Sequence, residues 1–275
     1  MVLEAILNPK SAENKPWTVL VLSMLLTALA IFLANIIFPS QASILSISFI
    51  AMFFIPFFQR LFRFEEEKDE IIARKHMKHE SIFKRHQKAI CVYSMFFIGI
   101  IIVYTLVFTF VPSLGNVFSL QADWFKGNAV DSVSGNAVSP TALFSKYFFN
   151  NTQVMLIFFI LSVIFGAGAV FILSWNASVI AVYMGMVVNK FVPTLGHSTA
   201  YIYGMTVGIS SIILHAIPEI SGYFFAGIGG GILSIALLRE KFMSKEFKEA
   251  GKDVLVWIVL AEFLIIIGAA IEAGL

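Results

Sequence analysis

Apolar residues fill most of this chain in long blocks that short polar stretches separate. A helix that crosses the hydrocarbon core of a bilayer needs about 20 mostly apolar residues. The apolar region 177–238 is interrupted twice, at "NKFVPTLGH" and at "HAIPE". The pattern therefore predicts an all-α, polytopic transmembrane helix bundle. Its apolar segments are 17–38, 42–58, 90–111, 153–173, 177–192, 199–214, 219–238 and 254–271.

Composition agrees with this class of protein. Hydrophobic residues make up 59% of the chain and charged residues 13%, with a mean hydropathy of +0.87, whereas a soluble domain has about 25% charged residues. We expect one transmembrane domain over 1–275, with the lipid bilayer as its main partner and no nucleic-acid partner. The single cysteine, Cys91, excludes an intramolecular disulfide.

Basic residues predict how the chain is oriented. Nine Lys and Arg lie in 59–89 and five in 239–253, while 112–152 contains only Lys126 and Lys146. Because cytoplasmic loops are enriched in Lys and Arg, we expect the two basic segments to be cytoplasmic. The loop 112–152 is then extracytoplasmic. The N-terminus is predicted on the cytoplasmic side of a cytoplasmic membrane, and the C-terminus on the other side.

The two long polar loops differ in character. The segment 59–89 is dense in charge and has few helix breakers, so we expect a solvated helical extension. Its His76, His79 and His86 do not lie beside carboxylates at metal-ligand spacing, and we expect no metal there. The segment 112–152 is rich in Gly, Ser and Asn and lacks periodicity, which predicts a surface loop.

This orientation creates a parity problem in the second half of the chain. The chain must cross an odd number of times between 152 and 239, but four apolar segments lie there. One segment must therefore fail to cross, and we expect seven full crossings plus a re-entrant or broken helix around 177–219. The best candidate is 177–192, and 199–214 is the alternative. Irregular backbone at that depth must be buried in protein or line a wet cavity.

Two acids, Glu219 and Glu262, lie well inside the apolar segments. A charge at the centre of a bilayer costs about 2.5–3.5 kcal/mol, so such residues mark functional sites by default. Pro218 predicts that one helix ends near His215 and that another begins with Glu219 in its first turn. A broken helix with polar groups at the break is a common transporter site. The alternative is structural: these groups bond to neighbouring helices or to free backbone.

Small residues recur every four positions in two segments, which favours close helix packing. One stripe contains Gly222, Ala226 and Gly230, and the other contains Ala181 and Gly185. If the two stripes face each other, Asn176 and Asn189 come near the break. We therefore predict a polar intramembrane site that consists of His215, Glu219, Glu262, Asn176 and Asn189.

Several motifs are similar to those of a known family. The specific ones are "FFNNTQVMLIFF", "GAGAVFILSWNASVIAV", "ILHAIPEISGYFFAG" and "AAIEAG"; weaker ones are "LNPKSAENKPW", "IIFPSQAS" and "EEEKDE". In these motifs the chain resembles the archaeal branch of the stage II sporulation protein M family of integral membrane proteins. Ala216 departs from the family pattern, in which glycine usually follows the histidine. The matching positions are Asn150, Asn151, Trp175, Asn176, His215, Pro218 and Glu219.

The resemblance implies a protein of the cytoplasmic membrane and does not imply sporulation. The bacterial namesake is similar in its C-terminal half and acts in an engulfment complex as the membrane partner of a cell-wall hydrolase. The resemblance therefore implies membrane or envelope partner proteins and no catalytic residues.

Three functions remain open from the sequence. The first is a non-enzymatic transporter, conduit or membrane core of a complex, built around the polar site. The second is a structural scaffold that forms a homodimer. The third is an intramembrane metallo-hydrolase, for which Glu262 would have to join His215 and Glu219 as a third ligand. We expect no cofactor, no resident metal and no catalytic residues.

Overall fold

A computed structural model describes residues 8–75, 82–132 and 139–275. Every regular element in these ranges is a helix, which confirms the predicted class. In chain order they are α2 (Pro9–Asn14), α3 (Trp17–Ile37), the 3₁₀ turn η1 (Pro39–Gln41), α4 (Ala42–Lys75), α5 (Ile82–Phe110), the 3₁₀ segment η2 (Pro112–Phe118), α6 (Ser119–Ser132), α7 (Pro140–Phe165), α8 (Ala169–Arg239) and α9 (Lys245–Ala273).

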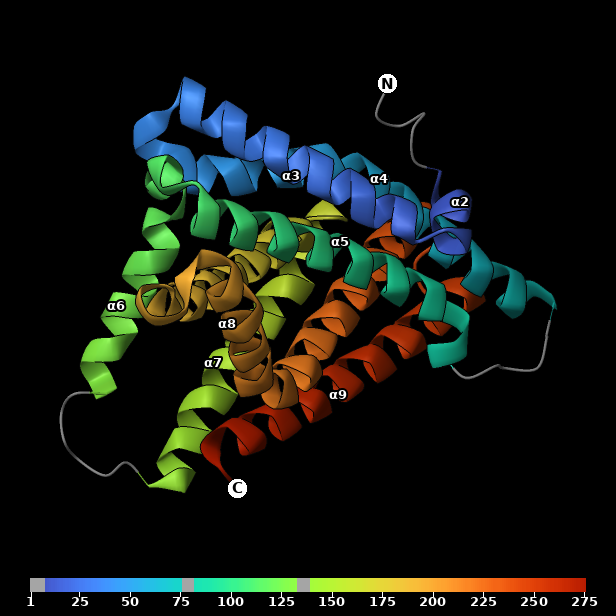
Figure 1. Cartoon of the computed structure of the whole chain (residues 1–275). Coiled ribbons are helices and arrows are strands. Elements are labelled where there is room, and N and C mark those ends of the chain that lie inside the picture. Colours follow the sequence, from blue (N-terminus) through green and yellow to red (C-terminus); the bar gives the residue numbers. More distant parts are fainter. Residues whose placement is uncertain (1–7, 76–81, 133–138) are drawn as a thin grey trace.

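The first long helices, α3, α4 and α5, lie side by side (Figure 1). Their interface is rich in aromatic side chains: the ring of Phe58 lies 4.6 Å from that of Tyr93 and 5.1 Å from that of Phe96, in edge contacts. At one end η1 and η2 meet, because the Asn116 side chain donates to the backbone oxygen of Pro39 at 2.8 Å. The turn after α3 and the turn after α5 are therefore at the same end of the bundle.

The predicted surface loop 112–152 is largely helical instead. It contains η2, α6 and the start of α7. Gln121 of α6 is fully buried, accepts a hydrogen bond from Ser43 Oγ at 2.8 Å and donates to Ser178 Oγ at 2.9 Å. These polar contacts dock α6 on α4 and α8. The sequence pattern missed this because α6 is held by hydrogen bonds and has no apolar stripe.

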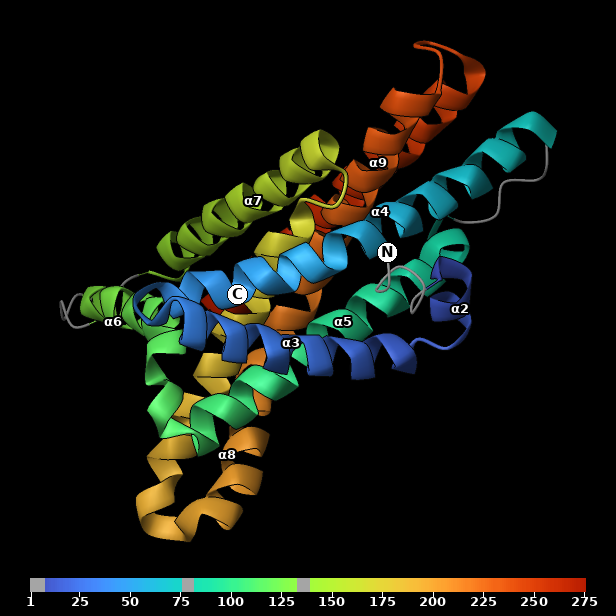
Figure 2. The ribbon, with the colours of Figure 1, turned by 90° about the horizontal axis from the view of Figure 1, so that it is seen from above.

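α8 folds back on itself as a helical hairpin. The only non-helical backbone within its 71 residues is at Gly196, where φ is 70° and ψ is 163°. The two limbs pack closely: Tyr183 Oη and Ser211 Oγ are 2.7 Å apart, and a Cβ on Gly204 would lie 2.6 Å from Val188 Cα. Figure 2 shows the hairpin projecting from the bundle. A positive φ favours glycine, so Gly196 determines where the chain reverses.

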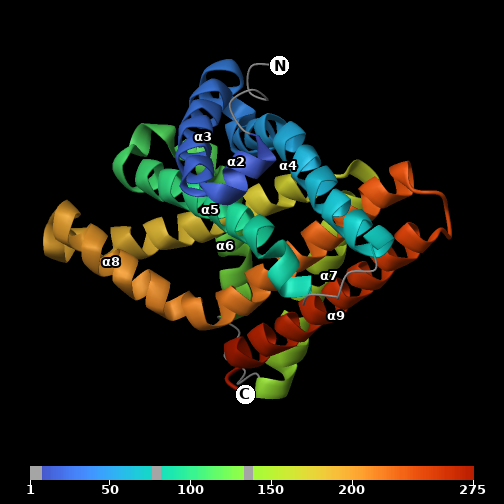
Figure 3. The same cartoon turned by 90° about the vertical axis from the view of Figure 1, so that its right-hand side faces the viewer.

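The expected break within 177–219 therefore lies at Gly196, and the expectation of a helix end at His215 is wrong. The helix continues through Pro218, and the second limb of α8 is bent (Figure 3). An internal proline removes one backbone hydrogen bond and kinks a helix. Such kinks are tolerated in membrane helices because neighbouring groups satisfy the freed carbonyl.

Six apolar helices in the described ranges are long enough to cross a membrane: α3, α4, α5, α7, α8 and α9. The chain is thus a multi-pass membrane protein. α8 is counted once although it doubles back, so the seven crossings and the re-entrant segment stay predictions. Figure 2 shows α2, the end of α4 and the turn between α8 and α9 on one side of the molecule. We call this side the basic end.

Candidate functional site

Glu219 of α8 lies against α9 at a glycine. A Cβ built on Gly268 would lie 2.5 Å from Glu219 Cγ, so the absence of a side chain there makes room for the carboxyl. The carboxyl is close to the side-chain amide of Asn151 and to the carboxyl of Glu272. Its Oε1 atom is buried and has no hydrogen-bond partner in the described chain.

Three helices contribute residues to the surroundings of the Glu219 carboxyl, and all three do so with the same spacing. Each presents two residues four positions apart, which lie on one face of a helix. From α7 these are Tyr147 and Asn151, from α8 Glu219 and Tyr223, and from α9 Gly268 and Glu272. We call this set the acid cluster. No ion pair joins either carboxyl to a Lys, Arg or His among the described residues, although the charge of Lys146 acts on Tyr147.

Glu262 lies about two to three helical turns before Glu272 on α9, at 1.5 Å of rise per residue. Its Oε1 accepts a hydrogen bond from Thr152 Oγ1 of α7 at 2.9 Å. Its Oε2 is buried and has no partner in the described ranges. Since Asn151 and Thr152 are adjacent in α7, the "NNT" sequence joins Glu262 to the acid cluster. Asn150 is exposed and donates to Asn151 Oδ1 at 3.1 Å.

Other predicted members of the polar site do not join it. His215 is half-buried and forms no hydrogen bond or ion pair with Glu219 in the described structure. Asn176 donates to the backbone oxygen of Ile172 at 2.9 Å, within its own helix. Asn189 is exposed near the Gly196 turn. Trp175, its neighbour in the family motif, packs against the core.

The small residues of α8 make close helix contacts, although the two stripes do not face each other. A Cβ on Gly222 would lie 3.0 Å from the backbone of Ala261 in α9, and one on Gly230 would lie 2.7 Å from the backbone of Phe159 in α7. Gly185 faces α5 instead: a Cβ built on it would lie 2.3 Å from Cδ1 of Phe108. Ala181 and Ala226 are fully buried. Each stripe thus packs on a different part of the bundle.

A second polar group lies at the basic end, where we expected a solvated helix. Glu65 and His86 are fully buried, and His86 Nδ1 lies 2.5 Å from Glu65 Oε2. Lys68 Nζ bridges Glu65 at 2.5 Å and Glu13 of α2 at 2.7 Å. The expectation of full solvation is wrong at these residues, because α2 and α5 cover this face of α4. His76 and His79 lie outside the described residues.

Glu13 lies outside the apolar helices and is itself titratable near neutral pH. Burial, reinforced by the neighbouring Glu65 carboxyl, raises the pKa of Glu13 to about 7 despite the attraction of Lys68. One local signal for this network was visible in the sequence: Glu65 and Lys68 are three residues apart, a spacing at which helical side chains meet. Glu13 and His86 come from other helices, α2 and α5, so no spacing within α4 predicted that they join this network.

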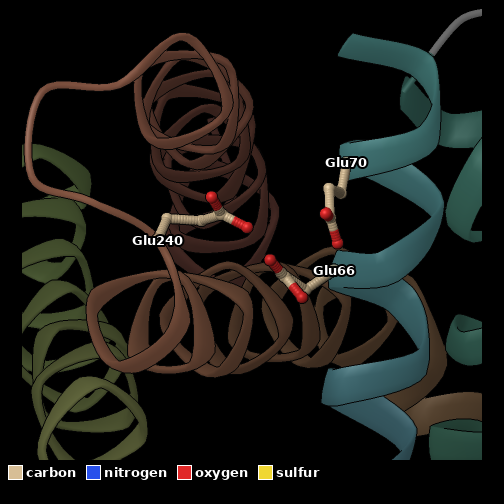
Figure 4. A group of neighbouring side chains, drawn as sticks. All are labelled: Glu66, Glu70 and Glu240. Carbon is tan, nitrogen blue, oxygen red and sulfur yellow. The ribbon is translucent and has the colours of Figure 1, made fainter. Parts of the chain in front are cut away.

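Three further carboxylates meet at the basic end. Glu66, Glu70 and Glu240 offer oxygens that lie within 4.8 Å of one another, and Figure 4 shows them facing a common space. Arg239 lies beside this group: it pairs with buried Glu66, and lies 3.5 Å from Glu67 and 3.7 Å from Glu70. A guanidinium among the carboxylates disfavours a divalent cation, so these residues fit an ion-pair network better than a metal site.

The acid cluster and Glu262 have a limited chemical repertoire. Two carboxyls in apolar surroundings, near enough for one charge to act on the other, resist ionising together without a cation or a shared proton. Buried carboxyl oxygens without partners need a donor or an ion. The geometry therefore suits uptake of protons or of a small monovalent cation. A metallo-hydrolase site would need His215 to join Glu219 and Glu262, and these side chains do not form a common ligand group.

Comparison with known proteins identifies the family. The family model described as Stage II sporulation protein M matches residues 89–275, well over half of the chain. This range contains α7, α8 and α9 with the acid cluster, whereas the motifs before residue 89 fall outside it. No curated protein and no solved structure matches the chain. The protein therefore belongs to the stage II sporulation protein M family, as an integral, multi-pass member of it.

Proposed function

We propose that this protein is a non-enzymatic membrane transporter or conduit, in which the acid cluster takes up a proton or a small monovalent cation. The observation that carries the proposal is the placement of Glu219. Its carboxyl is mostly buried beside Glu272, has an unpartnered oxygen, and has no basic partner in the described chain. A group in that position is neutral only when it holds a proton or a cation.

Glu262 supports the same function because it extends the acids along α9. Intramembrane carboxylates that are staggered along a bundle are typical of proton relays. Thr152 holds one oxygen of Glu262 and leaves the other without a partner. The bent second limb of α8 carries Glu219, so a change in that bend would move one acid relative to the others.

The proposal is tested with purified protein in liposomes that contain a pH-sensitive dye. A potassium diffusion potential is imposed, and the internal pH is followed with Na⁺ present or absent. We expect a potential-driven flux that Glu219→Gln abolishes, because the amide cannot exchange a proton. Glu249→Gln is the matched control, since Glu249 pairs with Lys252 on the surface at the other end of α9. The proposal fails if both variants conduct like the wild type.

The scaffold remains the second candidate, favoured by the glycine packing of α8 on α7 and α9. In that case the acids only tie helices together, and α7, the least buried of the apolar helices, would be offered to a second copy or to another membrane protein. The discriminating measurement is folding in detergent. If His215→Ala and Glu219→Gln prevent folding, the scaffold is supported; if they leave a folded protein without flux, the transport site is supported. A metallo-hydrolase requires bound metal in the elemental analysis of purified protein.

A further inference from the structure

A basic cleft lies between α2, the end of α4 and the start of α5. Its volume is about 380 Å³, and five basic side chains and one acid line it. The lining consists of Lys10, Glu13, Asn14, Phe64, Lys68, Lys84, Arg85, Gln87 and Lys88. Three helices that are distant in sequence thus direct cations toward one space, as a site for an anion requires.

Two of these cations form no ion pair with an acid of the described residues. Lys68 pairs with Glu13 and Glu65, and Arg85 Nη1 lies 2.5 Å from Asp253 Oδ2. Lys10 forms no ion pair in the described chain, and Lys88 donates to the neutral side chain of Asn14 at 3.0 Å. The paired cations hold the walls of the cleft in place, while Lys10 and Lys88 leave it positive.

The position of the cleft points to a ligand in the headgroup layer of the membrane. The apolar helix α3 begins at Trp17, directly after α2. The apolar segment of α5 begins at Ile90, two residues after Lys88, so the basic residues of the cleft lie just outside it. Trp17 is 59% exposed and Phe83 49% exposed. Exposed aromatic side chains at the ends of membrane helices are typical of the interface between hydrocarbon and water. The ring of Phe64, with Lys68 Nζ 4.7 Å from its centre, gives the cleft an apolar wall.

We propose that this cleft binds the phosphate group of an anionic phospholipid, with Lys10 and Lys88 as the main phosphate ligands. Basic pockets between membrane helices on the cytoplasmic side bind anionic headgroups. A free phosphate ion offers similar anionic oxygens, but it lacks the acyl chains that the exposed aromatic side chains beside the cleft would contact. The site is separate from the acid cluster and does not depend on the transport proposal.

The test uses the full-length protein in a neutral detergent. Its thermal unfolding is followed while phosphatidylglycerol, phosphatidylcholine or inorganic phosphate is added. We expect phosphatidylglycerol to stabilise the protein at much lower concentration than the other two. Each lysine near a phosphate contributes about fivefold in affinity. The variant Lys10→Gln/Lys88→Gln should therefore need roughly 25 times more phosphatidylglycerol for the same effect.

The control is Lys241→Gln/Lys248→Gln, which removes two exposed lysines from the same end of the molecule but outside the cleft. We expect it to respond like the wild type. Equal loss in both double variants would show unspecific surface attraction and overturn the site. Equal stabilisation by inorganic phosphate would overturn the lipid as its ligand. If the cleft double variant does not fold, Lys88→Gln alone should show the fivefold effect, and an unchanged response would again contradict the proposal.

Discussion

Glutamates are buried in two regions of this protein, and their partners differ completely. At the basic end, Glu65 contacts His86 and Lys68, and Glu66 pairs with Arg239. In the acid cluster, Glu219 has as neighbours another carboxyl, an amide and a glycine. In the first region each of these acids has a basic partner. In the second region no basic residue of the described chain pairs with Glu219, which is why we propose a proton or a cation as its partner.

Burial alone therefore does not assign a role to an intramembrane or interfacial acid. A buried ion pair is costly to break because the remaining charge loses its partner. A buried pair of like groups gains from losing one member. The same substitution, Glu to Gln, should therefore have opposite effects on stability in the two regions.

The largest effect is expected at Glu65. Glu65→Gln removes the partner of buried His86 and one partner of Lys68, and should lower the free energy of unfolding by about 3–5 kcal/mol. Equilibrium unfolding in mixed detergent micelles measures this. The matched change is Glu67→Gln, on the same helix but with a 43% exposed side chain, which should cost less than about 0.5 kcal/mol. Similar losses for both would mean that the network at the basic end does not stabilise the fold.

A smaller effect is expected where α9 makes room for Glu219. Gly268→Ala places a methyl group against Glu219 Cγ and should destabilise the protein by about 1–3 kcal/mol. Gly251 lies in the same helix with open space around it. Gly251→Ala should stabilise by about 0.5–1 kcal/mol, because alanine favours helix. The same unfolding assay compares the two, and a stabilising Gly268→Ala would contradict the close contact.

The third effect is small and opposite in sign to that of Glu65. Glu219→Gln keeps the shape of the side chain and removes one of two carboxyls that repel each other. We expect stability within about 1 kcal/mol of the wild type, on the stabilising side. A loss as large as that of Glu65→Gln would show that Glu219 is a structural partner after all, and the comparison between the two regions would collapse.

The last prediction concerns the pH dependence of stability and Glu13. Its pKa is about 7 in the folded protein and 4.5 as the ordinary value. The folded state therefore binds the proton more tightly, and this contribution to stability is complete below pH 4.5 and is lost as pH rises to about 7. Unfolding profiles from pH 4.5 to 8 should fall less steeply for Glu13→Gln than for the wild type. If the two profiles run parallel, the ionisation of Glu13 does not contribute to the pH dependence of stability.

The acids of α8 and α9 were predictable from the sequence, but the residues that surround them were not. Glu219 and Glu262 stand out because each interrupts an apolar block. Tyr147, Gly268 and Glu272 complete the site, and the spacing of four residues within each helix was the available signal. The helix end that we predicted near Pro218 is wrong: a proline ends many helices in water, but a packed membrane helix can continue through it with a bend. Asn176 and Asn189 lie away from the acid cluster, because the two small-residue stripes of α8 pack on different helices.

The helical membrane class follows from the amino-acid sequence, because apolar blocks of this length have few other stable forms in lipid or water. The charged ends of the helices and the costly acids within them are also visible in the sequence. Which charges are paired depends on the packing of the helices. Pairing depends on contacts between helices far apart in the chain, such as Glu13 with Lys68 or Thr152 with Glu262. No local pattern encodes these contacts, since each helix alone is satisfied by its own backbone hydrogen bonds and acquires its partners through packing.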